Sequence, residues 1–101
     1  MDAAKRADAP HAIDDLEARR RRLRYRAWHR GTREMDLMLG PYADAHAQAL
    51  DAPGLERLEA LMDEADTDLF KWVMGQEAAP QSVDRELLHQ LIDFRLAEGK
   101  K

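Results

Sequence analysis

The chain contains no cysteine among its 101 residues. This absence excludes a disulfide framework, a thiol nucleophile and a cysteine-ligated metal site, and it is compatible with a reducing compartment. No apolar run approaches the length of about 20 residues that a helix needs to cross a bilayer. The N-terminal residues include acids and lack an apolar core, which argues against a secretory or mitochondrial leader. We therefore expect a protein of the bacterial cytoplasm, without membrane insertion.

Glycines, histidines and aromatic residues are also few, and they are scattered. No glycine-rich loop follows a predicted strand, which argues against a nucleotide-binding enzyme. The four histidines do not have the spacing of a metal site; His89 and Asp93 share a helix face, and we interpret them as a surface pair. No pair of carboxylates stands out for acid–base chemistry. We expect a binding protein with no catalytic and no metal-binding residues.

Charged residues make up 36% of the chain, and alanine, leucine and methionine supply most of the apolar content. This composition favours helices, and the length suits one small core. We predict an all-α protein, a compact five-helix bundle. Residues 1–12 are predicted to be a disordered or frayed tail, and residues 13–98 a single domain.

Apolar residues recur at helical spacing in five segments separated by turn and capping residues. The first predicted helix runs from Ile13 to about Arg30, and the second from Gly31 or Thr32 to Leu50, with a kink or short break at Gly40-Pro41. The third opens with Asp51 and Pro53. The fourth is short, is capped within Asp66-Thr67-Asp68 and ends at Gly75, which suits a left-handed helix end; the fifth is capped by Ser82.

Charge is divided unevenly along the chain. Residues 1–33 hold ten basic and five acidic residues, about +5, whereas residues 34–101 hold six basic and fifteen acidic residues, about −9. The basic part is mostly an arginine run, which could pair with the acidic remainder of the same molecule or dock on an acidic partner. Nucleic acid is the least favoured partner, because the acidic remainder would repel phosphate. The run consists of Arg19, Arg20, Arg21, Arg22, Arg24, Arg26, Arg30 and Arg33.

An Arg30-Gly31-x-x-Glu34 (RGxxE) sequence joins the first two predicted helices. Gly31 permits a sharp turn, and Arg33 adds a second positive charge beside it. If Gly31 is the N-cap of the second helix, the Glu34 carboxylate can reach back to the cap amide. This reading makes the segment a helix-joining corner and nothing more; the other reading is a recognition site.

The segment from Arg30 to Asp36 resembles the Arg-Gly-x-Arg-Glu-hydrophobic-Asp signature of the succinate dehydrogenase flavinylation factors, also described as YgfY-like assembly factors. Pro41-Tyr42, the segment 68–74, and Leu91-Ile92 with Arg95 also resemble that family. The resemblance covers about residues 23–95. It implies an assembly factor that binds the flavoprotein subunit of succinate dehydrogenase or fumarate reductase. We expect the free factor to be a monomer. The factor would promote covalent attachment of FAD to that partner and hold no cofactor stably itself.

The resemblance also implies a partner-binding site. It places Arg30, Gly31 and Glu34 at the functional corner, with Arg33 and Asp36 beside them and Trp28, Pro41 and Tyr42 as rim contacts. Our hypothesis is that Arg30 and Arg33 contact acidic or carbonyl groups of the partner while Glu34 holds the turn. Trp72 is interpreted mainly as core, with an interface role as the other reading. The alternative function is a regulatory protein-binding module, an antitoxin-like or adaptor helical bundle.

Overall fold

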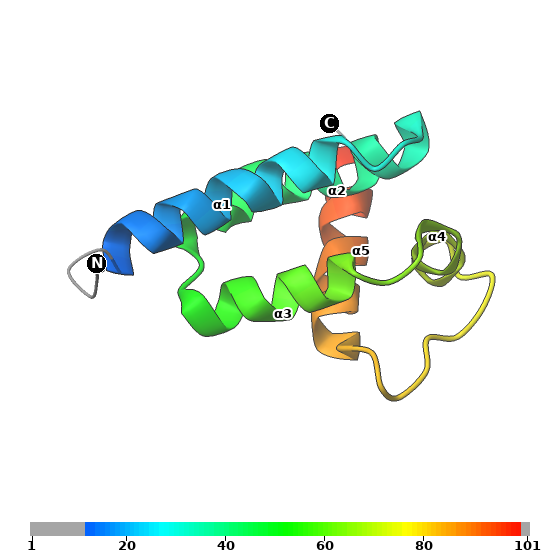
Figure 1. Cartoon of the computed structure of the whole chain (residues 1–101). Helices are drawn as coiled ribbons and strands as arrows, with labels where there is room; N and C mark the ends of the chain where they lie inside the picture. The colour runs from blue at the N-terminus through cyan, green and yellow to red at the C-terminus, as the bar shows by residue number, and fades with distance from the viewer. Residues whose placement is uncertain (1–11, 100–101) are drawn as a thin grey trace.

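The computed structural model describes residues 12–99, and almost all of the predicted tail therefore lies outside the described residues. The described part contains five α-helices, one short 3-10 helix and no strand, so the all-α prediction is confirmed. Helices α1 and α2 run antiparallel, α3 lies beneath α1, α5 crosses them, and the short α4 lies at one end (Figure 1). The elements are α1 (Ala12–Trp28), α2 (Arg33–His46), η2 (Ala47–Ala49), α3 (Ala52–Met62), α4 (Asp66–Val73) and α5 (Arg85–Gly99).

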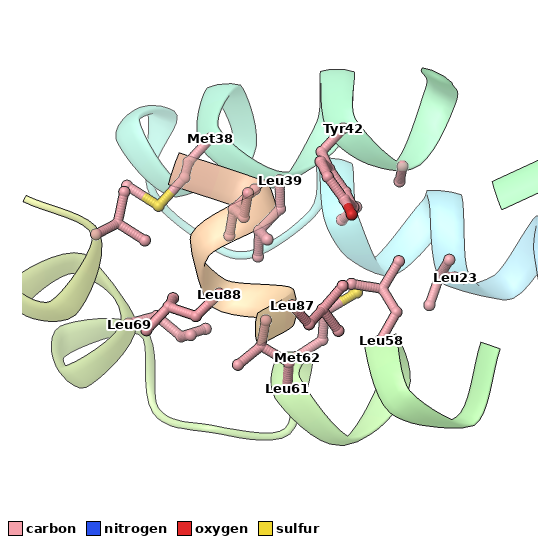
Figure 2. Packing of buried hydrophobic residues seen from close by; sticks show 14 of the residues in the cluster. Leu23, Met38, Leu39, Tyr42, Leu58, Leu61, Met62, Leu69, Leu87 and Leu88 are labelled. Carbon is pink, nitrogen blue, oxygen red and sulfur yellow. The ribbon is translucent and has the colours of Figure 1, made fainter. Parts of the chain in front are cut away.

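The core lies where all five α-helices meet. Side chains from each helix converge in Figure 2, among them Leu23 of α1, Leu39 of α2, Leu58 of α3, Leu69 of α4 and Leu88 of α5. Helices of this length are held mainly by the burial of such an apolar face and only weakly by their own propensity. The leucine and methionine periodicity of the sequence therefore accounts for the fold. The largest fully buried side chains are those of Leu23, Leu39, Leu55, Leu58, Met62, Leu69 and Leu91.

Helix α2 passes through Gly40-Pro41 without a break. The sequence predicted a kink or a short break there and a helix continuing to Leu50. The structure instead has one continuous helix to His46, followed by η2. Asp51 is the N-cap of α3, and its carboxylate accepts a hydrogen bond of 2.9 Å from the Gly54 amide. The predicted start of the third helix is thus confirmed.

Two predicted caps were wrong. Helix α4 has Ala65 at its N-cap, and its side chain makes no cap hydrogen bond. Helix α5 begins at Arg85 because Asp84, not Ser82, accepts a hydrogen bond of 3.1 Å from the Leu87 amide. The predicted left-handed residue after the fourth helix is confirmed, since Gly75 has φ +75°.

Several arginines of α1 are bonded to other groups of the molecule. Arg19 pairs with Glu59 and Arg26 pairs with Asp63, both at the side of α1 that faces α3. Arg20 donates to the carbonyl oxygen of Leu50 and pairs with Glu17. For these residues, pairing within the molecule is confirmed as the correct reading of the arginine run.

Candidate functional site

The connection between α1 and α2, residues 29–32, forms an exposed corner. Helix α1 ends at Trp28, two residues earlier than predicted, and Gly31 has φ +113°. Residues with a side chain rarely adopt this conformation, so the bend requires glycine. A Cβ atom built at Gly31 would have no atom within 4 Å. Glycine is therefore needed here for the backbone conformation, and the space beside it is open.

Thr32 and Asp36 hold the corner from the side of α2. Thr32 is the N-cap, and its hydroxyl accepts a hydrogen bond of 3.3 Å from the Met35 amide. The Asp36 carboxylate accepts a hydrogen bond of 2.6 Å from the backbone amide of Arg30. A charged acceptor makes the latter bond strong, and it links the end of one helix to the first turn of the next.

Glu34 does not hold the turn, contrary to our hypothesis. Because Thr32, not Gly31, is the N-cap, Glu34 lies one position too early to reach back to the cap amide. Its side chain is exposed, and within residues 12–99 it has no hydrogen-bond or ion-pair partner. Its negative charge still lies in the first turn of α2, where the helix dipole stabilises it.

Arg30 is directed into the molecule. Its guanidinium donates to the Asp66 carboxylate at 2.6 and 2.9 Å and to the carbonyl oxygen of Glu64 at 3.3 Å. The side chain is only 11% exposed. The structure thus corrects the hypothesis of a direct contact between Arg30 and a partner: this arginine fastens the corner to the start of α4.

Trp28 is also used internally. Its indole ring lies over Gly40, where a Cβ atom would come within 2.3 Å of the ring. The indole Nε1 donates a hydrogen bond of 3.0 Å to the Asp44 carboxylate. The end of α1 is thereby fixed against the middle of α2, and the rim of the corner is formed by only part of this half-buried side chain.

Two aromatic residues of the predicted interface lie in the core. Tyr42, predicted as a rim contact, is 5% exposed, and burial raises the pKa of its hydroxyl. Trp72 is 7% exposed, so the reading of this residue as core is the correct one. The sequence did not show which of the adjacent residues Pro41 and Tyr42 faces the core. In the structure Tyr42 is buried, whereas Pro41, on the neighbouring face of the same helix, is only half-buried.

The residues that remain available at the corner form one surface, which we call the corner face. It comprises Gly31, Arg33, Glu34, Leu37 and Pro41. Leu37 is 52% exposed, and with Pro41 it borders a groove of about 650 Å³ between α2 and α5. Leu37 was not among the predicted site residues, although its spacing of three and four residues from Glu34 and Arg33 places all three on one helix face. Two side chains of opposite charge, an exposed backbone bend and an exposed apolar side chain suit recognition of a protein surface.

The described residues hold no group of three or more histidine, aspartate or glutamate side chains that could bind a metal ion. Within the same range, no helix is both long enough and apolar enough to cross a membrane.

Comparison with known proteins gives a consistent result. The family model described as flavinator of succinate dehydrogenase matches residues 21–95. The FAD assembly factor SdhE of Acetobacter pasteurianus is 36% identical over 89 residues, which cover 87% of this chain and 82% of the relative. The mitochondrial succinate dehydrogenase assembly factor 2 of Dictyostelium discoideum is 30% identical over 75% of this chain and 54% of its own length. That of Candida glabrata is 30% identical over 87% of this chain and 60% of its own length. The chain thus spans only part of these two mitochondrial relatives. No solved structure gives a significant match.

Proposed function

The chain belongs to the family of succinate dehydrogenase flavinators, and we propose that it binds the flavoprotein subunit of succinate dehydrogenase and promotes covalent attachment of FAD to that subunit. The single observation that carries the proposal, beyond family membership, is the exposed corner at Gly31. It combines the RGxxE sequence with open space at the bend and with side chains left available for a partner.

The corner acts through its shape and charge. Asp36 and Arg30 hold the backbone from inside the molecule, so little conformational entropy is lost when the corner docks. Arg33 and Glu34 then meet polar groups of the partner, and Gly31 permits close approach of the two backbones. Binding stabilises the partner conformation in which the flavin ring and the acceptor histidine, both held by the partner, are aligned. The factor contributes no bond-forming group and is not itself an enzyme.

The same surface serves fumarate reductase if its flavoprotein subunit presents the same features, and we include that subunit among the proposed partners. We further propose that the free factor is monomeric, resides in the bacterial cytoplasm and holds no flavin stably. Purified factor should accordingly be colourless. Nucleic acid has no part in this function.

The experiment replaces Gly31 by arginine in cells that otherwise lack the protein. Gly31→Arg should leave helicity nearly unchanged, because the space beside Gly31 is open within the molecule. It should abolish covalent flavin on the succinate dehydrogenase flavoprotein, because the new side chain strains the bend and obstructs the approach of the partner. In-gel flavin fluorescence of the partner measures this outcome, and circular dichroism of the purified variant checks its fold.

Gly75→Arg is the matched control. Gly75 also has a positive φ and no atom within 4 Å of an added Cβ, but it lies at the end of α4. The added charge is therefore the same, each substitution places a side chain on a backbone with positive φ, and flavinylation should persist with Gly75→Arg. Normal flavin fluorescence with Gly31→Arg would overturn the proposal, as would recovery of a toxin or cytoskeletal protein without any flavoprotein in a pull-down.

A further inference from the structure

The outward side of α1 carries a second charged surface. Leu23 and Ala27 are buried and fix the orientation of the helix. Residues on the opposite side, at spacings of three and four, are all exposed. We call this surface the α1 stripe; it consists of Arg21, Arg22, Tyr25 and His29.

The two arginines of the stripe differ from the other arginines near them. Among residues 15–98, whose side chains the structure describes, neither Arg21 nor Arg22 has a hydrogen-bond or ion-pair partner. The other arginines between Arg19 and Arg30 are all bonded, whereas no carboxylate of residues 15–98 pairs with the two arginines of the stripe. The bonded pairs are Arg19 with Glu59, Arg20 with Glu17, Arg24 with Gln48, Arg26 with Asp63, and Arg30 with Asp66.

Tyr25 and His29 form a stacked aromatic pair beside these charges. Their rings stack at a centroid distance of 3.9 Å and an interplanar angle of 15°. The His29 Nδ1 lies 2.7 Å from the carbonyl oxygen of Tyr25, to which it donates a hydrogen bond in the tautomer that carries the proton on Nδ1. Tyr25 is nevertheless 65% exposed, which is unusual for so large a side chain held in one position. It lines a shallow hollow together with the adjacent arginines.

These features fit an acidic peptide segment. Guanidinium groups bind carboxylates through paired hydrogen bonds, and an exposed tyrosine packs against the aliphatic part of a glutamate side chain while its hydroxyl donates. Tyrosine and arginine are also the residue types that dominate binding energy at protein interfaces.

We propose that the α1 stripe binds an acidic segment of the succinate dehydrogenase flavoprotein subunit next to the place where the corner docks. The inference rests on the proposed function. The stripe ends beside the corner, because His29 is the first residue after α1 and lies two residues before Gly31. The part of α1 from Arg21 to its end at Trp28 spans only about 10 Å of helix. One partner surface can therefore contact both.

The charge of the remaining molecule favours a short acidic segment over nucleic acid or an anionic membrane. A duplex or a bilayer extends well past two arginines, and it would meet the acidic residues that make the chain −4 overall. Few phosphate contacts would also leave such binding weak at physiological salt.

The test measures the affinity of the purified flavoprotein subunit for full-length factor. Arg22→Glu and Arg21→Glu should each weaken binding about tenfold at low salt, and the difference should shrink at about 0.5 M salt, where exposed charges are screened. Glutamate favours helix, so α1 should persist. Lys71→Glu on α4 is the matched control: it makes the same charge change at an exposed residue without a partner among residues 12–99, and binding should stay within about twofold of wild type.

A second readout separates docking from the action of the corner. Excess Arg22→Glu factor should restore full flavinylation of the partner, whereas excess Gly31→Arg factor should not. If wild type binds the flavoprotein and the stripe variants bind like Lys71→Glu, the stripe inference fails and the proposed function stands. If wild type does not bind the flavoprotein, the proposed function fails and this inference fails with it. Wild-type factor could instead bind duplex DNA or anionic vesicles at physiological salt, and Arg22→Glu could abolish that binding. This result would overturn the inference that the stripe binds an acidic protein segment.

Discussion

Gly40 and Trp28 are matched to each other at the scale of single residues. The indole ring occupies the space where any other residue at position 40 would place its Cβ atom. Glycine in a helix interior lowers helix stability relative to alanine, and here the packing of the tryptophan compensates for that cost. Nothing in the sequence indicated this contact, because the two residues belong to different helices.

Gly40→Ala should therefore destabilise the protein, although alanine is the better helix former. The added methyl group must displace the Trp28 ring, which should lower the free energy of unfolding by about 1–3 kcal/mol. Urea unfolding followed by circular dichroism measures this change.

A double-mutant cycle with Trp28→Leu provides the control. The smaller side chain leaves room for a Cβ atom at position 40, so Gly40→Ala should cost much less in that background, or even stabilise the helix. Equal costs in both backgrounds would show that the ring does not restrict position 40.

The residues of the corner also show how far sequence reasoning could reach. The exposure of Gly31, Arg33 and Glu34 follows from their position at a polar junction of two helices, and the structure agrees. The inward direction of Arg30 could not be predicted, since its partner Asp66 is 36 residues away. Periodicity identifies which residues share a helix face, but it does not identify the face of another helix that they meet.

At the scale of elements, the predicted helices were placed well wherever an apolar period was strong, and their ends were placed less well. Asp51 and Gly75 act as expected, because each satisfies backbone groups at a helix end without competition. At α5, Ser82 and Asp84 were both capable of capping. Asp84 prevails, and it also binds Arg57 of α3 through contacts of 2.6 and 3.0 Å.

Asp84 should make the attachment of α5 sensitive to acid. The Arg57 guanidinium, and less strongly the Leu87 amide, lower the pKa of the Asp84 carboxyl. A carboxyl group whose pKa is lowered by folding stabilises the folded state above its ordinary pKa of about 3.9 and loses this contribution as the pH falls through the lowered value. Asp84→Ala should lower the free energy of unfolding by about 1–2 kcal/mol at neutral pH. The free energy of unfolding of this variant should also fall less steeply than that of wild type as the pH is lowered.

Thermal unfolding at a series of pH values measures this effect. Ser82→Ala, the residue that the sequence suggested as the cap, should behave like wild type throughout. An Asp84→Ala protein that loses stability on acidification as steeply as wild type would assign the acid sensitivity to other carboxyl groups.

At the scale of the whole molecule, ion pairs connect the basic first helix and its corner to acidic residues of α3 and α4. The exposed pair of Arg26 with Asp63 contributes little alone. The pair of Arg30 with Asp66 differs because the arginine is nearly buried and donates three hydrogen bonds. It is the contact through which α4 supports the position of the corner.

Asp66→Ala should therefore impair flavinylation from a distance. Loss of the carboxylate leaves the Arg30 guanidinium without its main acceptor and should lower the unfolding free energy by about 1–3 kcal/mol. Covalent flavin on the partner should fall partially, since the corner residues remain but are held less firmly. Urea unfolding and in-gel flavin fluorescence measure the two effects.

Asp68→Ala is the control for this substitution. Asp68 lies in the same first turn of α4, so its loss changes the helix dipole interaction similarly, but its side chain has no partner among residues 12–99. Flavinylation should stay normal. Equal loss with both variants would attribute the effect to α4 stability and not to the corner.

The open space around Gly31 has a consequence for inherited variation. Because Gly31, Arg33 and Glu34 make few contacts with the rest of the chain, alleles at these positions should yield normal amounts of protein that no longer works. Alleles at Arg30, Asp36 or Trp28 should instead reduce abundance, because proteolysis removes chains whose helices are poorly joined. Protein level and activity should thus separate the two groups in any collection of natural variants.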